Sequence, residues 1–142
     1  MLQTDFIDAL PQSQEPALPP GSSKRRVMIV DDNSFFSRCL AALINHEADL
    51  MVCDTANSYV QLVKIIVNAH PQLLLMDVCI GEDNGIEIAK KLRSMKVEIP
   101  ILLTSSVAEP TSDELLSIGR CSFISKFQKP ADFLRQIRAF TP

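Results

Sequence analysis

Short apolar runs alternate with amphipathic patterns along most of this 142-residue chain. The apolar runs are VMIV (27–30), LMVC (50–53), LLLM (73–76), ILL (101–103) and CSFIS (121–125). Runs of this length are typical of buried strands, and the apolar residues between them recur three and four positions apart, as in helices. Strands that alternate with helices form right-handed crossovers and a parallel sheet covered on both faces. We therefore predict a doubly wound α/β fold with five parallel strands and five helices.

The predicted helices carry start and stop signals. Asp32 and Ser34 are both candidate N-caps for the first helix, and Asn57 is the predicted N-cap of the second. Gly119 is expected to end a short fourth helix. The last helix is expected to begin just after Pro130, because proline is well tolerated in a first helical turn.

Charge and cysteine content argue against several classes of protein. The net charge is −3, and the one basic cluster, Lys24-Arg25-Arg26, is predicted to flank the first strand rather than bind nucleic acid. The four cysteines form no CxxC pair, so we predict reduced, buried thiols rather than a zinc site. No apolar stretch approaches the roughly 20 residues that span a bilayer, and no secretory signal is recognisable. A cytoplasmic protein is expected.

Residues 1–23 differ in composition from the rest of the chain. Four of the nine prolines fall between Pro11 and Pro20, among Gln, Ser and Glu residues. This composition favours a flexible or disordered leader. We therefore place the folded domain at residues 24–142.

Polar residues follow four of the five predicted strands. Asp31 and Asp32 follow the first strand, and Asp77 ends the third. Ser105 follows the fourth strand and Lys126 follows the fifth. In doubly wound folds the ligand crevice lies at this carboxyl edge, where the strand order reverses. With the order 2-1-3-4-5, three carboxylates converge, and their repulsion calls for a hard divalent cation such as Mg²⁺.

The same residues predict phosphoryl chemistry. A carboxylate can accept a phosphoryl group as a nucleophile, and a lysine and a hydroxyl can stabilise the transferred charge. Each residue alone also has an ordinary explanation as a helix cap, a turn residue or a surface charge. Their joint placement at one edge of the sheet is what favours a phosphoacceptor site.

Four segments, VMIVDDNSFFSR, LLLMDVCIGEDNGIEIAKKLR, IPILLTSS and GRCSFISKF, resemble the receiver domain of two-component response regulators. The resemblance extends from residue 26 to about residue 140. It implies the flavodoxin-like strand order 2-1-3-4-5 and makes Asp77 the phosphoacceptor. It also implies that Asp32 binds Mg²⁺ directly, that Asp31 acts mainly through water, and that the backbone carbonyl of Cys79 completes the metal site.

The resemblance assigns three further roles. Lys126 would bind the phosphoryl group, Ser105 would be the switch hydroxyl, and Phe123 would be the switch aromatic. Counting five residues from Pro100 favours Ser105 as the switch hydroxyl, and Thr104 remains open if the strand register differs by one. Phe123 also fits an ordinary core-facing position in a strand.

The family implies a signalling domain rather than an enzyme. It would accept a phosphoryl group from a sensor histidine kinase or a histidine phosphotransfer protein and switch a surface around the last two strands. The output partner is open, and a phosphorylation-dependent homodimer is one expected readout.

Two alternatives remain: the regulatory half of a DNA-binding regulator, and a scaffold that is not phosphorylated. A haloacid dehalogenase-type phosphatase is disfavoured because Cys79 stands where its second Asp would be, and no glycine-rich nucleotide motif is present.

The chain departs from the family pattern at several positions. Phe127 follows Lys126 where the family has proline after a cis bond. A non-proline cis bond costs about 3–4 kcal/mol, so we predict a trans bond here. Gly81 replaces a proline and is expected to loosen its loop. Neither Cys79 nor Val107 offers a carboxylate or carboxamide to orient a water, which predicts slow hydrolysis of the phosphorylated state.

Overall fold

The computed structural model describes residues 24–141, and the predicted leader over residues 1–23 lies outside this range. Its main sheet has five parallel strands in the order β2-β1-β3-β6-β7. In chain order this is 2-1-3-4-5, so the predicted topology is confirmed. The strands are β1 (Arg25–Val30), β2 (Leu50–Ala56), β3 (Leu73–Asp77), β6 (Ile101–Ser105) and β7 (Cys121–Ser125).

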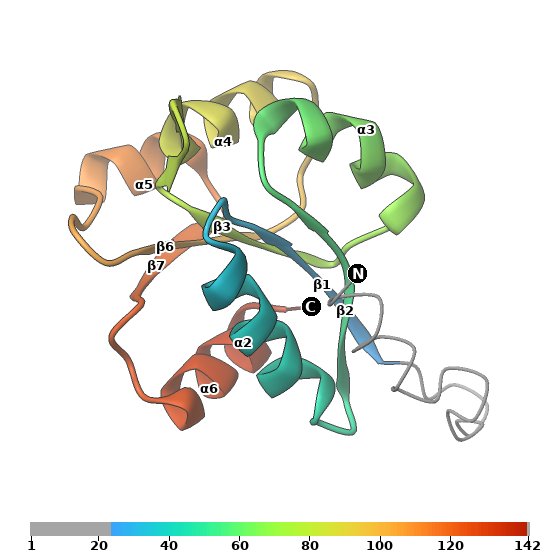
Figure 1. Cartoon of the computed structure of the whole chain (residues 1–142). Coiled ribbons are helices and arrows are strands. Elements are labelled where there is room, and N and C mark those ends of the chain that lie inside the picture. The colour runs from blue at the N-terminus through green and yellow to red at the C-terminus, as the bar shows by residue number, and fades with distance from the viewer. Residues whose placement is uncertain (1–23, 142) are drawn as a thin grey trace.

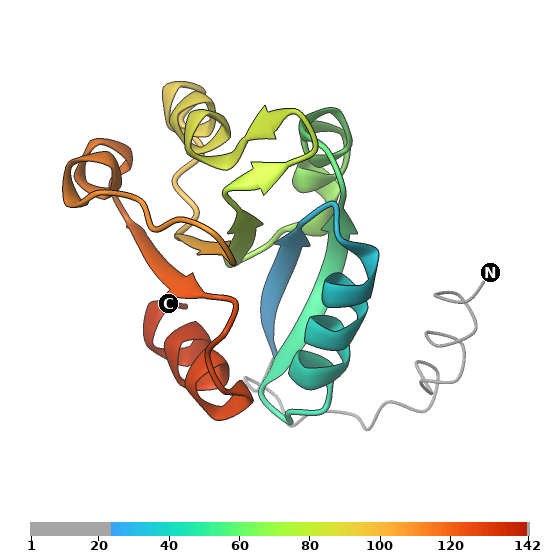
Figure 2. The same ribbon diagram turned by 60° about the vertical axis from the view of Figure 1, so that its left-hand side comes forward.

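A short antiparallel hairpin follows β3 and was not predicted. It consists of β4 (Cys79–Ile80) and β5 (Asp83–Asn84). Figure 2 shows this hairpin in yellow-green beyond the end of β3. Two-residue strands are too short to produce an alternation pattern in the sequence.

Helices cover both faces of the sheet. The five helices of the described range are α2 (Ser34–Asn45), α3 (Tyr59–Ala69), α4 (Gly85–Ser94), α5 (Ser112–Ile118) and α6 (Pro130–Phe140). Figure 1 shows α2 and α6 on one face and α3, α4 and α5 on the other. The predicted helix count is therefore confirmed.

Strand alternation builds one core on each face. In β1, Val27 and Ile29 belong to the core beneath α2 and α6, whereas Met28 and Val30 belong to the core beneath α3, α4 and α5. All four side chains are almost completely buried. The central strands read as continuous apolar runs because both of their faces are covered.

Two predicted N-caps are wrong by one residue. Asn33 caps α2, and its side chain accepts a hydrogen bond of 2.9 Å from the Phe36 amide. Ser58 caps α3 instead of Asn57. Asp32 is not the cap, and its carboxylate instead contacts the loop that contains Gly81. Gly119 does mark the helix end predicted for it, and α6 begins at Pro130 itself rather than just after it.

The cysteines of the described range are free thiols, as predicted, but two of them are exposed. Cys39 lies on the outer side of α2 and Cys79 lies in the short hairpin, and both contact solvent. Cys53 and Cys121 are half-buried, and burial raises the pKa of the Cys121 thiol to about 11. The prediction of uniformly buried thiols is therefore wrong.

Arg93, near the end of α4, connects two loops at the edge of the sheet opposite the carboxyl ends. Its guanidinium donates to the carbonyls of Val97 and Ile99 before β6, at 2.9 and 3.0 Å. It also donates to the carbonyls of Gly119 and Arg120 before β7, at 2.7 and 3.1 Å. Burial lowers the pKa of this guanidinium, and the described residues give it no carboxylate partner. Backbone carbonyls therefore satisfy the charge.

We expect Arg93→Met to lower the free energy of unfolding by about 2 kcal/mol, because several carbonyls lose a charged donor. Arg93→Lys should recover only part of this loss, since an ammonium cannot reproduce the planar fork of donors. Urea unfolding of both variants measures the effect. Arg135→Met is the matched control, because Arg135 is exposed and, within residues 24–141, its ion pair is with Asp132 on its own helix. Equal losses at positions 93 and 135 would contradict the assigned role.

Candidate functional site

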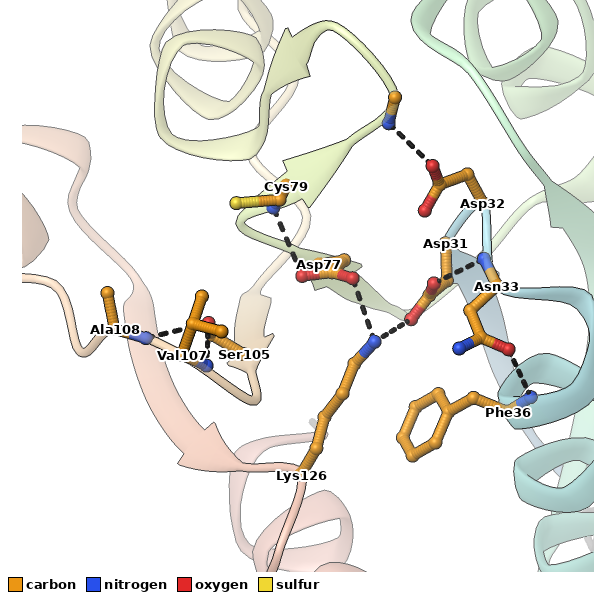
Figure 3. Close-up of polar contacts among 11 residues, drawn as sticks. Asp31, Asp32, Asn33, Phe36, Asp77, Cys79, Ser105, Val107, Ala108 and Lys126 are labelled. Atoms are coloured by element: carbon orange, nitrogen blue, oxygen red, sulfur yellow. Dashed lines mark hydrogen bonds and ion pairs between the residues drawn. The ribbon is translucent and has the colours of Figure 1, made fainter.

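Asp31, Asp77 and Lys126 meet at the carboxyl edge of the sheet. Asp31 directly follows β1 and Asp77 ends the adjacent β3, while Lys126 follows β7. The Lys126 Nζ lies 2.8 Å from an Oδ2 atom of each aspartate. Figure 3 shows the lysine reaching between the two carboxylates. The side chains of Asp31, Asp77 and Lys126 are only 2%, 10% and 10% exposed, so these ion pairs are largely shielded from water.

Asp32 lies at the outer side of this cluster. It is exposed, and its Oδ2 accepts a hydrogen bond of 2.7 Å from the Gly81 amide. A proline at position 81 would lack this N–H group. Gly81 also has a φ of +60°, in the left-handed region that glycine adopts readily. The looser loop expected from Gly81 stays a prediction, and the amide of this glycine connects the loop to Asp32.

The backbone around Asp77 requires a glycine at position 85. A Cβ atom at Gly85 would lie 2.1 Å from the Asp77 carbonyl oxygen, far inside van der Waals contact. The Gly85 amide donates to the Val78 carbonyl at 2.7 Å, and the Cys79 amide donates to Asp77 Oδ1 at 3.0 Å. The spacing between Asp77 and Gly85 in the sequence thus reflects the close approach of Gly85 to the backbone carbonyl of Asp77.

The three carboxylates form a donor set suited to a hard cation. One oxygen each from Asp31, Asp32 and Asp77 lies within 4.8 Å of the others. Carboxylate oxygens at this spacing, at the rim of a buried cluster, fit the oxygen ligands that Mg²⁺ prefers. The predicted convergence of these residues is confirmed by the geometry.

Burial and pairing shift the titration of the cluster. Burial raises the pKa of Asp31, although hydrogen bonds from Lys126 and from the Asn33 amide oppose the shift. For Lys126, burial alone would lower the pKa, but the hydrogen bonds to Asp31 and Asp77 outweigh it and raise the pKa. Lys126 therefore stays charged at neutral pH, and its one positive charge is shared by the two carboxylates of Asp31 and Asp77.

Ser105 lies beside the cluster but not in contact with it. It is the buried last residue of β6, and its Oγ accepts hydrogen bonds of 3.1 Å from the Val107 and Ala108 amides. Among the described residues, no hydrogen bond joins Ser105 to Asp77, and Figure 3 shows the two side chains apart. In β6, alternation places Ser105 on the face of Leu103 and places Thr104 on the opposite face.

The loop after β7 is connected to β6 through its backbone. The Lys126 amide donates to the Ser105 carbonyl at 3.0 Å, and the Phe127 amide donates to Ser125 Oγ at 3.1 Å. No cis peptide bond occurs in the described range, which confirms the trans bond predicted between Lys126 and Phe127. Phe123 pairs with Leu103 and is half-buried against the core beneath α3, α4 and α5.

One residue of the site was missed by the sequence. The Lys126 Nζ lies 4.4 Å from the centroid of the Phe36 ring. In the sequence Phe36 is only an apolar position in the first turn of a helix. No motif marks this contact, because it depends on how the start of α2 faces the loop after β7.

The pKa of Asp31 predicts a pH dependence of stability in metal-free protein. Because burial raises its pKa above 3.8, the folded state binds the Asp31 proton more tightly than the unfolded chain does. Its contribution to the free energy of unfolding is therefore largest below about pH 4 and is lost as pH rises through the folded-state pKa. Asp31→Asn removes this titration, so we expect the variant to gain stability relative to wild type as pH rises. Urea unfolding with EDTA across this range measures it, and a pH-independent difference would contradict it.

Sequence comparison places this chain among proteins of one family. A family model described as the response regulator receiver domain matches residues 27–138. A protein-glutamate methylesterase/protein-glutamine glutaminase of Caldanaerobacter subterraneus subsp. tengcongensis is 30% identical over 106 residues, which are 72% of this chain and 29% of the relative. The transcriptional regulatory protein LiaR of Bacillus subtilis is 29% identical over 115 residues, which are 80% of this chain and 54% of LiaR. The chain thus spans only part of the length of these relatives.

Solved structures show the same fold. The response regulator domain of Thermotoga maritima CheB matches with a TM-score of 0.72 and 25% identity, covering 82% of this chain and 95% of that domain. The receiver domain of the putative response regulator NarL from Mycobacterium tuberculosis matches in fold with a TM-score of 0.71 at 19% identity, covering 82% and 95%. No helix within residues 24–141 is long and apolar enough to cross a membrane. The chain belongs to the response regulator receiver domain family of two-component systems.

Proposed function

We propose that this domain accepts a phosphoryl group on Asp77 in a Mg²⁺-dependent reaction and uses it to switch a surface around β6 and β7. The observation that carries the proposal is the shielded cluster in which Lys126 lies 2.8 Å from both Asp31 and Asp77. A buried carboxylate with an adjacent lysine, two further carboxylates and a backbone amide has the groups that phosphoryl transfer requires.

In the proposed step, a carboxylate oxygen of Asp77 attacks the phosphorus of a phosphohistidine on a sensor histidine kinase or a histidine phosphotransfer protein. The P–O bond forms as the P–N bond breaks, and the electron pair returns to the imidazole, which takes up a proton from water. Asp32, Asp77 and the Cys79 carbonyl are the proposed ligands of Mg²⁺, with Asp31 acting through water. When bound, the ion offsets negative charge on the phosphoryl oxygens.

The phosphorylated aspartate carries nearly two negative charges, and two nearby groups can respond to it. Lys126 already contacts Asp77, so its ammonium can pair with a phosphoryl oxygen. The Ser105 hydroxyl accepts two hydrogen bonds from its own loop, and its O–H remains a donor for another phosphoryl oxygen. Movement of Ser105 toward Asp77 would strain or break those loop contacts.

The side chains that would transmit the change lie on the sheet face that carries Ser105. Phe123 lies on the face of β7 that continues that of Leu103 and Ser105 in β6. A shift of the Ser105 loop changes the space beside this ring, and therefore the surface formed by β6, β7, α5 and α6. This is a local charge event that biases a two-state element. A partner, or a second copy of the chain, would read the altered surface.

The relatives leave the output open. LiaR is named a transcriptional regulatory protein, which keeps the regulatory half of a DNA-binding regulator as the alternative function. Methylesterase and glutaminase activities are named for relatives of which this chain covers 29%, and we do not extend them to it. We propose no enzyme activity beyond the phosphorylation and dephosphorylation of the domain itself.

We expect one phosphoryl group per chain after incubation with acetyl phosphate and Mg²⁺, because Asp77 has both its positioning and its charge partners in place. Intact mass spectrometry measures the addition. Asp77→Asn should abolish it, and omission of Mg²⁺ should do the same. Asp83→Asn is the matched control, since Asp83 is an exposed aspartate in the adjacent hairpin. Absence of phosphorylation in the wild type, with a phosphohistidine donor as well, would favour the scaffold alternative.

Slow hydrolysis remains a prediction and is tested at Val107. Val107 is 79% exposed in the loop after Ser105, and Cys79 is exposed in the hairpin after Asp77. Neither side chain carries a carboxylate or carboxamide that could orient an attacking water. Val107→Glu adds an acceptor for the attacking water and should shorten the lifetime of the phosphorylated state roughly ten-fold or more. Val107→Leu controls for a change of size alone. Decay that is unchanged or slower in Val107→Glu would count against the prediction.

A further inference from the structure

We propose that Phe36 is a positioning residue for Lys126. The Phe36 ring keeps the Lys126 ammonium beside Asp77 while the carboxylates of Asp31 and Asp77 exchange their contacts with it for contacts with the metal ion or the phosphoryl group. The inference rests on the proposed function, since it concerns the lysine of the same site. It adds a residue that no sequence motif marks and a role that differs from core packing.

The geometry is that of a cation–π contact. The Lys126 Nζ lies 4.4 Å from the centroid of the Phe36 ring, within the distance over which the ring face attracts a cation. The Lys126 side chain is only 10% exposed, so water competes weakly for its charge. Figure 3 shows the ring beside the lysine, on the side opposite Cys79. The ammonium thus has three neighbours: two carboxylates and one neutral aromatic face.

Phe36 is itself held in place from two sides. Its amide donates to the Asn33 side chain that caps α2, at 2.9 Å. Its ring packs against the buried Phe133 of α6, with centroids 6.3 Å apart and planes tilted by 58°. A ring fixed by a helix cap and by a second helix can restrain a flexible side chain that contacts it.

The chain has a reason to need such a restraint. The backbone of Lys126 is anchored by its hydrogen bond to the Ser105 carbonyl, but four rotatable carbons separate that backbone from the ammonium. The next residue, Phe127, is 80% exposed and contributes no apolar anchor to the loop. The far end of the lysine is therefore positioned only by what its ammonium contacts.

A neutral partner suits the proposed reaction better than another acid would. When the oxygens of Asp31 and Asp77 turn to a divalent cation or a phosphoryl group, Lys126 loses part of its contact with them. The ring of Phe36 cannot bind that cation as a carboxylate does, and it adds no negative charge to repel the phosphoryl group. Its attraction for the ammonium is therefore available at every stage of the transfer.

The test replaces Phe36 with phenylalanines that carry one, two, three or five fluorines, which weaken the ring's attraction for a cation while nearly keeping its shape. The rate of phosphorylation by acetyl phosphate, at saturating Mg²⁺, should fall stepwise along the series, by roughly five-fold in total. The same series at Phe133, which touches Phe36, controls for ring packing. The series at Phe35, which is 69% exposed, controls for the incorporation itself. A flat series at Phe36, or an equal trend at Phe133, would overturn the proposal.

A second measurement needs neither metal nor phosphorylation. In EDTA, urea midpoints of wild type, Phe36→Leu, Lys126→Met and the double variant form a mutant cycle. We expect Phe36→Leu to lower the midpoint more when Lys126 is present than when it is Met, whereas Phe35→Leu should give no such difference. Additive effects at Phe36 would overturn the ring–lysine contact. If the urea cycle shows coupling between Phe36 and Lys126 but no phosphorylation occurs, only the proposed function is refuted. If phosphorylation occurs but its rate is unchanged along the fluorine series, only the positioning role is refuted.

Discussion

The ion pairs of Lys126 with Asp31 and Asp77 join three strands at one point. Each aspartate comes from the end of a central strand, β1 or β3, and the lysine comes from the end of β7 at the edge of the sheet. Two carboxylates this close repel each other, and a shared ammonium reduces that repulsion. The order β2-β1-β3-β6-β7 is therefore what makes the site: any order that separates β1 from β3 would leave each aspartate without the other.

The backbone links this cluster to the element that would respond to it. The Lys126 amide donates to the carbonyl of Ser105, and the Ser105 hydroxyl is bound by the next loop along the chain. Thus the lysine and the hydroxyl belong to one continuous network of hydrogen bonds. At the other end of α5, Arg93 fixes the loop that leads into β7.

The sequence was sufficient to predict the strand order, the helix count and the meeting of the charged residues, because those features follow from periodicity and from the carboxyl edge of a parallel sheet. It could not predict the features that depend on local geometry. The hydrogen bond from the Gly81 amide to Asp32 is one of these features. The contact of Phe36 with Lys126 and the exposure of Cys39 likewise depend on the direction in which a helix faces its neighbours. Periodicity locates an apolar position, but not the atom it touches.

The burial of a carboxylate at this edge of the sheet costs folding free energy, and this cost points to a functional role for the site. Burial raises the pKa of Asp31, which means that its ionised form is disfavoured in the folded protein. A sequence selected for stability alone would place an apolar or neutral side chain there, since buried ion pairs rarely repay their desolvation. Among the described residues, the buried carboxylates are those of Asp31 and Asp77 at this edge, while apolar cores cover both faces of the sheet. Such a local conflict between charge and burial is expected where a site serves chemistry rather than folding. The neutral ring of Phe36 fits the same logic, because it stabilises the one cation without adding to the excess of negative charge.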